Sequence, residues 1–557
     1  MKKILFFAAV LVFVAVGCTK DDITTVSDST ATSDDDDGGT VITDVTATDT
    51  VTVTFSSSGD ATVSGTGTYV SATVSGNDVT ITNSGEEVVC YRLNGTTSDG
   101  FFKLYSSKKQ VVILNSVSIS HNSGAAINIQ SSKPTYVVVN GSNTLTDGTS
   151  YTETPSTEDE KACLFSEGEL IFSGSGSLTV TARGGAGICS DDYVDVQASP
   201  TIKVTSSAGH GIRGKEKIVV QSGSLDISTS ASMKKGLSSD SLVRFDGGET
   251  TIKVTGSAAY DSEDKDYSGT AGVKADVSFV MNGGTLTITN SGTGGKGISC
   301  DGTGAFNGGT VTVTVTGSNY TSGDISAKGI KCDGNITFGG STVTVKCSHH
   351  EGIESKGTIT VSDGVVYSYS AGDDAINSAS HFTISGGMVC GHATSNDGLD
   401  ANGNFYITGG LVYAIGTSSP EVAIDANTEG GYKLYVQGGT LIAIGGLENN
   451  SSLTQSCYQA SSWSKSTWYG LTVGSTTYAF KTPSSGGTPL VVSGGSTEPT
   501  LQSGVSVSGG TDYFEGTLKR DGTVSGGSSV TLSSYTGGNG GGPGGGGGPG
   551  GGPGGWK

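Results

Sequence analysis

Short runs in which apolar and polar residues alternate recur along most of the chain. Two examples are Thr-Leu-Thr-Ile-Thr at 285–289 and Thr-Val-Thr-Val-Thr at 310–314. Alternation with a period of two predicts strands that bury one face, and threonine and valine both favour strands over helices. The pattern therefore predicts an all-β protein.

A second pattern marks a repeating unit. A small residue followed by Ile, Leu or Val recurs along the chain, and we call the apolar residue of each pair the anchor. The anchors are Ile127, Leu164, Ile188, Ile212, Leu237, Val273, Ile298, Ile330, Ile353, Ile376, Leu399 and Ile424. Most successive anchors lie 23 to 25 residues apart, with three clearly longer units, and a second turn, usually Gly-Gly, follows most of them.

A unit of this length has room for three short strands and no helix, which is typical of one coil of a parallel β-helix. Leucine-rich repeats need a consensus that is absent here, and propeller blades need about 40 residues. The sequence therefore predicts a right-handed, single-stranded parallel β-helix of about 12 or more coils. Equivalent positions of successive coils then stack into ladders about 4.8 Å apart.

The N-terminus predicts export and a lipid anchor. Lys2 and Lys3 precede an apolar run at 4–16 that is too short to span a bilayer but fits a signal peptide. The run ends in Ala-Val-Gly-Cys, which resembles a bacterial lipobox and predicts a signal peptide over 1–18 with lipid on Cys18. The alternative is an ordinary signal peptide with an incidental cysteine. The acidic residues that follow favour an outer-membrane lipoprotein exposed at the cell surface, with the lipid as its sole membrane contact.

The rest of the chain divides by composition. Residues 19–50 form an acidic Ser/Thr/Asp tether, and residues 51–445 form the β-helix, of which 51–125 are an N-terminal cap and first strands. Residues 446–535, where the period fades, predict a β-rich C-terminal cap. Residues 536–557 are a Gly/Pro tail that has no means of burying a core.

Composition and charge narrow the function. The 557 residues include 91 glycines, and 52 acidic residues against 31 lysines and arginines give a net charge of −21. Such a balance excludes a nucleic-acid binder, which needs cationic surface to meet phosphate. Many of the glycines serve the corners of the coils, where positive φ angles are needed. We expect the chain to act as a monomer.

Acidic residues gather at equivalent positions of neighbouring coils. Those one residue after the anchor, or in the loop before it, are Glu351, Glu354, Asp373, Asp374, Asp397, Asp400, Glu421 and Asp425. Stacked carboxylates repel one another unless a cation lies between them. Hard oxygen ligands on adjacent strands suit Ca²⁺, which takes six to eight oxygens in irregular geometry. The sequence thus predicts a calcium site, and the alternative is a solvated acidic face with turn-forming Asp and Asn.

Lysines and tyrosines suggest how a sugar chain could be held. Lys328 and Lys331 belong to a lysine cluster on the coils before the acidic residues, where they attract acidic sugars or pair with nearby aspartates. Tyr367, Tyr369 and Tyr413 fall on strand positions that point outward. Exposed aromatic faces can stack on sugar rings, although such residues also pack beneath covering loops.

Three segments carry a family resemblance. Asn-Thr-Leu-Thr-Asp-Gly-Thr-Ser-Tyr at 143–151, Cys-Leu-Phe-Ser-Glu-Gly-Glu-Leu-Ile-Phe at 163–172 and His-Gly-Ile-Arg-Gly-Lys-Glu-Lys-Ile at 210–218 resemble a family of secreted bacterial carbohydrate-binding β-helix proteins. The resemblance extends over about 52–535. It implies a fold like that of the pectate lyases, with calcium-dependent binding of cellulose and acidic plant sugars and without evident lyase activity. His210 departs from the acidic residue expected there, which weakens the case for a calcium ligand at that coil.

These features favour a binding protein over an enzyme. The leading hypothesis is a surface lipoprotein that holds plant-type or acidic polysaccharide on a calcium-stabilised β-helix. The first alternative is a calcium-dependent, pectate-type lyase, which would need Lys331 or Lys356 as base beside a carboxylate-bound cation. The second alternative is a non-enzymatic adhesin or spacer.

Overall fold

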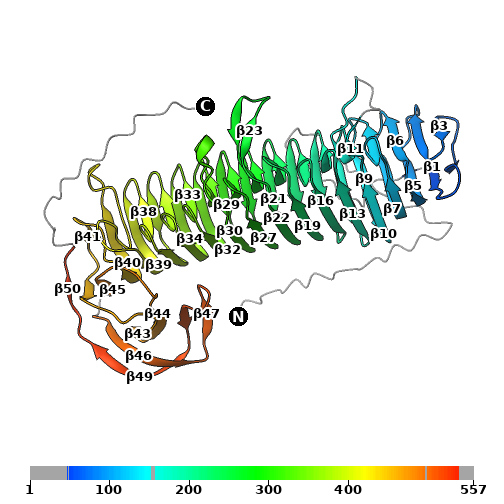
Figure 1. Ribbon diagram of the computed structural model, residues 1–557. Coiled ribbons are helices and arrows are strands. Elements are labelled where there is room, and N and C mark those ends of the chain that lie inside the picture. The colour runs from blue at the N-terminus through cyan, green and yellow to red at the C-terminus, as the bar shows by residue number, and fades with distance from the viewer. Residues whose placement is uncertain (1–46, 48, 152–156, 496–497, 538–557) are drawn as a thin grey trace, which may run out of the picture.

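The computed structural model describes residues 47, 49–151, 157–495 and 498–537. The predicted signal peptide, Cys18, most of the tether and nearly all of the Gly/Pro tail lie outside these residues. The described chain forms a rod of stacked coils with a smaller β-sheet beside its C-terminal end (Figure 1). No helix in the described ranges is long and apolar enough to cross a membrane.

All the anchors except Ile424 lie on one 14-stranded sheet, here called the ladder sheet. Its strands are β3 (Val70–Ser75), β4 (Asp78–Asn83), β6 (Phe101–Ser106), β8 (Ile127–Gln130), β11 (Ala162–Ser166), β14 (Ala186–Ser190), β17 (Ile212–Gly214), β20 (Lys235–Ser239), β25 (Ala271–Ala275), β28 (Lys296–Cys300), β31 (Lys328–Cys332), β33 (Ile353–Ser355), β35 (Ile376–Ser378) and β38 (Leu399–Ala401). All neighbours except β3 and β4 pair in parallel. Successive anchors pair in register and are buried, as Ile298, Ile330 and Ile353 show.

A 28-stranded sheet supplies the other two faces of the coils. The second face holds β9 (Thr135–Asn140), β12 (Leu170–Gly174), β15 (Tyr193–Val196), β18 (Lys217–Val220), β21 (Leu242–Phe245), β26 (Ser278–Met281), β29 (Thr303–Phe306) and β36 (Phe382–Ile384). The third face holds β10 (Ser142–Thr146), β13 (Ser177–Ala182), β16 (Thr201–Ser206), β19 (Ser224–Thr229), β22 (Glu249–Val254), β27 (Thr285–Asn290), β30 (Thr310–Val315) and β37 (Met388–Ala393). The strands that span both faces are β5 (Val89–Thr97), β7 (Gln110–Ser120), β32 (Ile336–Cys347), β34 (Ile359–Ser370), β39 (Phe405–Ile415) and β40 (Leu434–Ile444).

This architecture confirms the predicted fold class: a nearly all-β parallel solenoid of about 14 turns. The stack runs further than the anchor pattern predicted, because bridges join Leu399 to Ile424 and Ile424 to Leu447. Inside the coils, aromatic rings also stack along the rod. The rings of Phe279 and Phe306 lie 5.2 Å apart, and those of Phe306 and Phe338 lie 4.9 Å apart.

Glycine pairs form the corner between the second and third faces. Gly284 has a φ of +77°, and a Cβ there would lie 2.5 Å from backbone atoms of Gly247 in the preceding coil. The backbone conformation and the close approach of the next coil therefore both require glycine.

Replacing Gly284 by alanine is expected to lower the free energy of unfolding by more than about 1 kcal/mol, because strain and a backbone clash add. Gly431→Ala is the matched control, since Gly431 also has a positive φ but nothing lies within 4 Å of its added Cβ. Denaturant unfolding of both variants measures the difference. If both variants lost the same free energy of unfolding, the close approach of the preceding coil would add nothing to the cost of the substitution at Gly284.

The C-terminal region extends the rod and covers its flank. β45 (Leu490–Gly494) runs antiparallel to β40 and to β42 (Cys457–Ala460), whose other edge pairs with β50 (Ser533–Tyr535), and β41 (Ser452–Leu453) adds to β40. Six further strands form an antiparallel sheet, here called the flank sheet: β43 (Trp468–Val473), β44 (Thr476–Lys481), β46 (Thr500–Ser508), β47 (Thr511–Tyr513), β48 (Leu518–Arg520) and β49 (Thr523–Val530). The flank sheet packs against the third face of the last coils through a separate hydrophobic core (Figure 1).

The remaining elements lie at the N-terminal end and in insertions. β1 (Asp49–Phe55) pairs in parallel with β5 and antiparallel with β2 (Thr62–Ser64). β23 (Ala259–Asp261) and β24 (Asp266–Ser268) form a hairpin, and a 3-10 turn covers Thr321–Gly323.

Candidate functional site

Two positions of each coil place side chains together on the outer side of the ladder sheet. One is the residue directly after the anchor, and the sequence prediction for it is confirmed, because Lys331, Glu354, Asn377 and Asp400 are register partners on successive strands. The other lies two residues before the anchor. Ion pairs between the two positions, such as Lys328 with Glu354, show that both face the same side.

The charge of this surface changes sign along the rod. The basic half carries Arg213, Lys235, Lys274, Lys296, Lys328 and Lys331. The acidic half carries Glu351, Glu354, Asp374, Asp397, Asp400, Asp425 and Glu448. The change occurs between two adjacent strands, β31 and β33.

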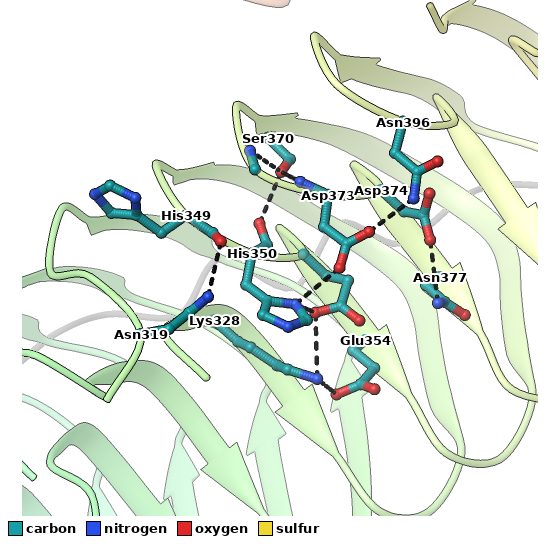
Figure 2. A network of polar contacts seen from close by, with 12 residues as sticks. Asn319, Lys328, His349, His350, Glu354, Ser370, Asp373, Asp374, Asn377 and Asn396 are labelled. Atoms are coloured by element: carbon teal, nitrogen blue, oxygen red, sulfur yellow. Dashed lines mark hydrogen bonds and ion pairs between the residues drawn. The ribbon is translucent and has the colours of Figure 1, made fainter. Parts of the chain in front are cut away.

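Opposite charges neutralise each other where the two halves meet (Figure 2). The Lys328 ammonium lies 2.5 Å from Glu354 Oε2 and 3.2 Å from Glu351 Oε2, and all three side chains are buried. Lys356 also pairs with Glu354, and His350 pairs with Glu351. Burial would raise the pKa of Glu351, but the contact with His350 and the charge of Lys328 lower it to about 2. These two glutamates are therefore compensated without a metal ion.

The acidic half beyond this junction has no such compensation. Oxygens of Asp397, Asp400 and Asp425 lie within 4.8 Å of one another. Burial, followed by repulsion between the carboxylates, raises the pKa of Asp374 to about 9 and that of Asp400 to about 7. Burial likewise raises the pKa of Asp397 to about 8, together with the charges of Asp425, Asp400 and Glu421. Among the described residues, no lysine or arginine forms an ion pair with these aspartates.

The oxygens of this half fit a hard divalent cation. Asn377 lies between the coils of Glu354 and Asp400, and its amide nitrogen donates to Asp374 Oδ2 at 3.2 Å. Its Oδ1 is buried and has no hydrogen-bond partner within the described part of the chain. A buried carbonyl oxygen without a donor beside several carboxylates is what a Ca²⁺ site supplies. Asp374, Asn377, Asp397, Asp400 and Asp425 are thus the residues that could hold the ion.

One member of the acidic half, Glu448, was missed by the sequence analysis. It accepts a hydrogen bond from Thr428 Oγ1 at 3.0 Å, and burial and the neighbouring Asp425 raise its pKa to about 8. A sequence signal existed, because Leu447 lies 23 residues after Ile424 and so continues the anchor spacing. No Gly-Gly turn follows about ten residues after Leu447, because 447–469 contains no glycine, and this obscured the signal.

The other predicted metal ligands lie around this group. Asp373 accepts a hydrogen bond from Asn396 at 2.7 Å and lies 3.1 Å from His350 Nδ1, so it belongs to the junction (Figure 2). Glu421 precedes the Asp425 coil and acts on Asp397 by its charge. The structure thus divides the eight predicted carboxylates into a neutralised group with Glu351, Glu354 and Asp373, and an uncompensated group.

The lysines differ in how they are paired. Lys331 pairs with Asp333 at 2.5 Å, which confirms the ion-pair alternative for this residue, and Lys274 pairs with Asp276 at 2.9 Å in the same way. Lys328 is engaged by two glutamates and is buried, so it is not a free contact for sugar. Burial, then neighbouring cations, lowers the pKa of both Lys235 and Lys296 to about 8.

The prediction that the three tyrosines expose their faces is wrong for two of them. Tyr367 and Tyr413 do point away from the coil interior, but the flank sheet covers them. The Tyr413 hydroxyl donates to Lys481 O at 2.8 Å, and the Tyr367 ring lies 6.1 Å from that of Phe514. Tyr369 is half-buried, edge-on to His392. Strand alternation showed the direction of these side chains but not what covers them.

Comparison with known proteins gives a match at the family level. Residues 75–232 and 229–320 match a family described as "Carbohydrate-binding domain-containing protein". This part of the chain is similar to a carbohydrate-binding family. The match covers under half of the chain and ends before the acidic half of the ladder sheet.

A solved structure offers a second comparison. A polysaccharide lyase-like protein from C. thermocellum, solved as a gadolinium derivative, is 23% identical, with a TM-score of 0.38 over 45% of this chain and 95% of that chain. A similarity of this size says nothing about function. No curated protein matches the chain.

Proposed function

We propose that this protein is a surface lipoprotein that binds acidic polysaccharide along the ladder sheet and holds Ca²⁺ in the acidic half. The lipid anchor rests on the lipobox-like motif at Cys18. Polysaccharide binding is supported by the match to the carbohydrate-binding family. The calcium proposal rests on the close oxygens of Asp397, Asp400 and Asp425 and on Asn377, which lies beside Asp374 and Asp400 with its Oδ1 buried and unpartnered among the described residues.

The arrangement has a chemical rationale. A divalent cation would remove the repulsion that otherwise keeps protons on these carboxylates. An ion held by Asp and Asn oxygens on one side keeps coordination positions for a carboxylate of an acidic sugar on the other side. The lysines of the basic half would attract further carboxylates of the same chain.

Polygalacturonate is the probe that tests this proposal. The full-length protein is expected to retain polygalacturonate in the presence of Ca²⁺, and retention is expected to fall at least about ten-fold after dialysis against chelator and to return when calcium is restored. The measurement is retardation in affinity electrophoresis. If the protein bound cellulose alone, and chelator did not change that binding, the proposed requirement for calcium would be contradicted.

The same samples distinguish binding from lyase chemistry. A lyase needs a neutral amine near the sugar carboxylate, whereas Lys331 and Lys356, the predicted bases, pair with Asp333 and Glu354. We therefore expect no product that absorbs in the ultraviolet. Accumulation of unsaturated product would replace the binding proposal by the lyase alternative.

A further inference from the structure

Two of the long units of the repeat place insertions at the same edge of the ladder sheet. The unit between Leu237 and Val273 contains the β23–β24 hairpin, and the unit between Ile298 and Ile330 contains the turn at Thr321–Gly323. Figure 1 shows the hairpin standing out from the row of coils. A single coil, with its β28 strand, lies between the two insertions.

The insertions bring three tyrosines together. Tyr260 and Tyr267 are direct partners across the hairpin, with ring centroids 5.2 Å apart in an edge-to-face arrangement. The Tyr267 ring lies 5.8 Å from that of Tyr320 in the second insertion. Tyr260 is 51% exposed and Tyr267 is 37% exposed, which places both among the most exposed large hydrophobic side chains in the described residues. Unlike the tyrosines beneath the flank sheet, these rings are open to a ligand.

Glycines at the contact between the two insertions allow the three tyrosines to pack closely. Gly294, on the coil between them, has a φ of +69°, and an added Cβ would lie 2.8 Å from Ala258 Cβ and 2.9 Å from Tyr320 Cβ. At Gly323 an added Cβ would lie 2.4 Å from Cγ of Tyr267. The rings are therefore fixed by packing rather than carried on loose loops, which lowers the entropic cost of binding a ligand.

The tyrosine cluster adjoins the two lysines of the basic half, Lys235 and Lys296, that form no ion pair among the described residues. Lys235 Nζ donates to Ser268 Oγ of the hairpin at 3.2 Å and to Met233 O at 2.7 Å. Lys296 begins β28, on the coil between the insertions, and among the described residues no ion pair reaches it. Lys235, Ala271, Lys296 and Lys328 are successive register partners. An aromatic surface and uncompensated cations thus lie side by side.

We infer that Tyr260, Tyr267 and Tyr320, with Lys235 and Lys296, form a subsite for the uronic acid residues of a polysaccharide. The inference rests on the proposed polysaccharide-binding function and adds to it a place and a sugar class. The C–H groups of a pyranose ring pack on the tyrosine faces. The carboxylate of the same or an adjacent sugar meets the ammonium of Lys296, which then gains the partner it lacks.

The charges of the hairpin restrict how such a chain lies. Asp261 and Asp266 form the next pair toward the hairpin tip, and Glu263 and Asp264 follow. These acids repel a polyanion at the tip. Tyr260 and Tyr267, one pair nearer to the solenoid, are the aromatic surface that an acidic chain can reach while it stays close to the lysines.

Titration calorimetry of the full-length, calcium-loaded protein with oligogalacturonate and a cello-oligosaccharide of equal length tests the subsite. Y260A/Y267A is expected to lower affinity for oligogalacturonate about ten-fold or more, because two stacking faces are lost. Y260F/Y267F is expected to keep wild-type affinity, since phenylalanine retains the faces. Y69A is the matched control, because Tyr69 is 63% exposed in the turn directly before β3, far from the insertions. K296Q is expected to weaken oligogalacturonate binding and to leave cello-oligosaccharide binding unchanged.

Each outcome separates the subsite from the proposed function. If the wild type binds oligogalacturonate and Y260A/Y267A binds it equally well, the subsite is wrong while the proposed function stands. If the wild type binds neither oligosaccharide, both are overturned. If K296Q weakens both ligands equally or neither of them, the assignment to acidic sugars is wrong. Unchanged calcium binding and thermal unfolding of Y260A/Y267A would show that its loss of affinity does not come from misfolding.

Discussion

Calcium binding is expected to disappear when Asp397 and Asp400 are both replaced by asparagine. The double variant D397N/D400N removes two charges from the group of Asp397, Asp400 and Asp425, whose oxygens lie within 4.8 Å of one another, and Ca²⁺ affinity depends on ligand charge. In the wild type, calcium at 100 times its dissociation constant should stabilise the fold by about 2.7 kcal/mol. In the variant, calcium should leave the unfolding temperature unchanged. Differential scanning calorimetry with and without Ca²⁺ measures this.

D301N/D333N is the matched control for this experiment. It removes the same number of charges from the ladder sheet, but from the basic half, where Asp301 and Asp333 pair with Lys274 and Lys331. The control is expected to keep the full response to calcium. An equal loss in both double variants would mean that overall charge, and not a defined site, governs the effect.

The same carboxylates predict how pH acts on the metal-free protein. In the folded chain the pKa values of Asp374 and Asp397 are about 9 and about 8, whereas unfolded aspartates titrate near about 4. The folded state therefore binds more protons between these limits, and its stability falls as pH rises from about 4 to about 9. Unfolding in chelator at pH 5 and pH 9 should show this loss, and D397N/D400N should reduce it. Rising stability over that range would contradict the assignment.

Removal of the Lys328 ammonium is expected to destabilise the protein more than removal of any other single lysine of the ladder sheet. In K328M, the buried Glu351 and Glu354 lose the cation that lies between them. Breaking a buried ion pair by removing one partner typically costs about 3–5 kcal/mol. Chemical denaturation measured above pH 7, where both glutamates are ionised in the unfolded chain, gives the difference.

K331M provides the comparison within the same strand. Lys331 pairs with Asp333, which is partly exposed, and such pairs contribute about 0–1 kcal/mol. We therefore expect K331M to unfold close to the wild type. If K328M were as stable as K331M, the junction between the two halves would not depend on charge compensation, and the hydrophobic packing of the methionine would suffice.

The repeat explains why so much of the fold could be predicted from the sequence. Each coil places an anchor inside, so spacing alone fixed the register that puts Lys331, Glu354 and Asp400 in one ladder. Features set by contacts between distant segments could not be predicted in this way. The flank sheet that covers Tyr413 lies beyond the repeat, and its packing on the third face has no periodic signal. The tyrosine cluster likewise depends on two insertions meeting across an intervening coil.

The candidate calcium site shows a similar division. The acidic residues were predicted as a single set. Sequence alone could not show which of their carboxylates are already neutralised by a lysine or histidine side chain of the protein. Lys328 lies a full coil before Glu351, and only the stacking of coils places its ammonium between two glutamates. Asn377 carried no sign in the sequence that its carbonyl oxygen would be buried without a donor.

The ends of the rod bear on how copies of this protein behave toward one another. A parallel solenoid whose last coil is open offers a row of free N–H and C=O groups, and head-to-tail pairing of such ends grows a filament. Here antiparallel strands cover part of each end of the stack. β2 and β3 run against β1 and β4 at the first coils, and β45 runs against β40 at the last. A second copy cannot continue the parallel coil pattern across these strands, which disfavours end-to-end growth of the rods into a filament.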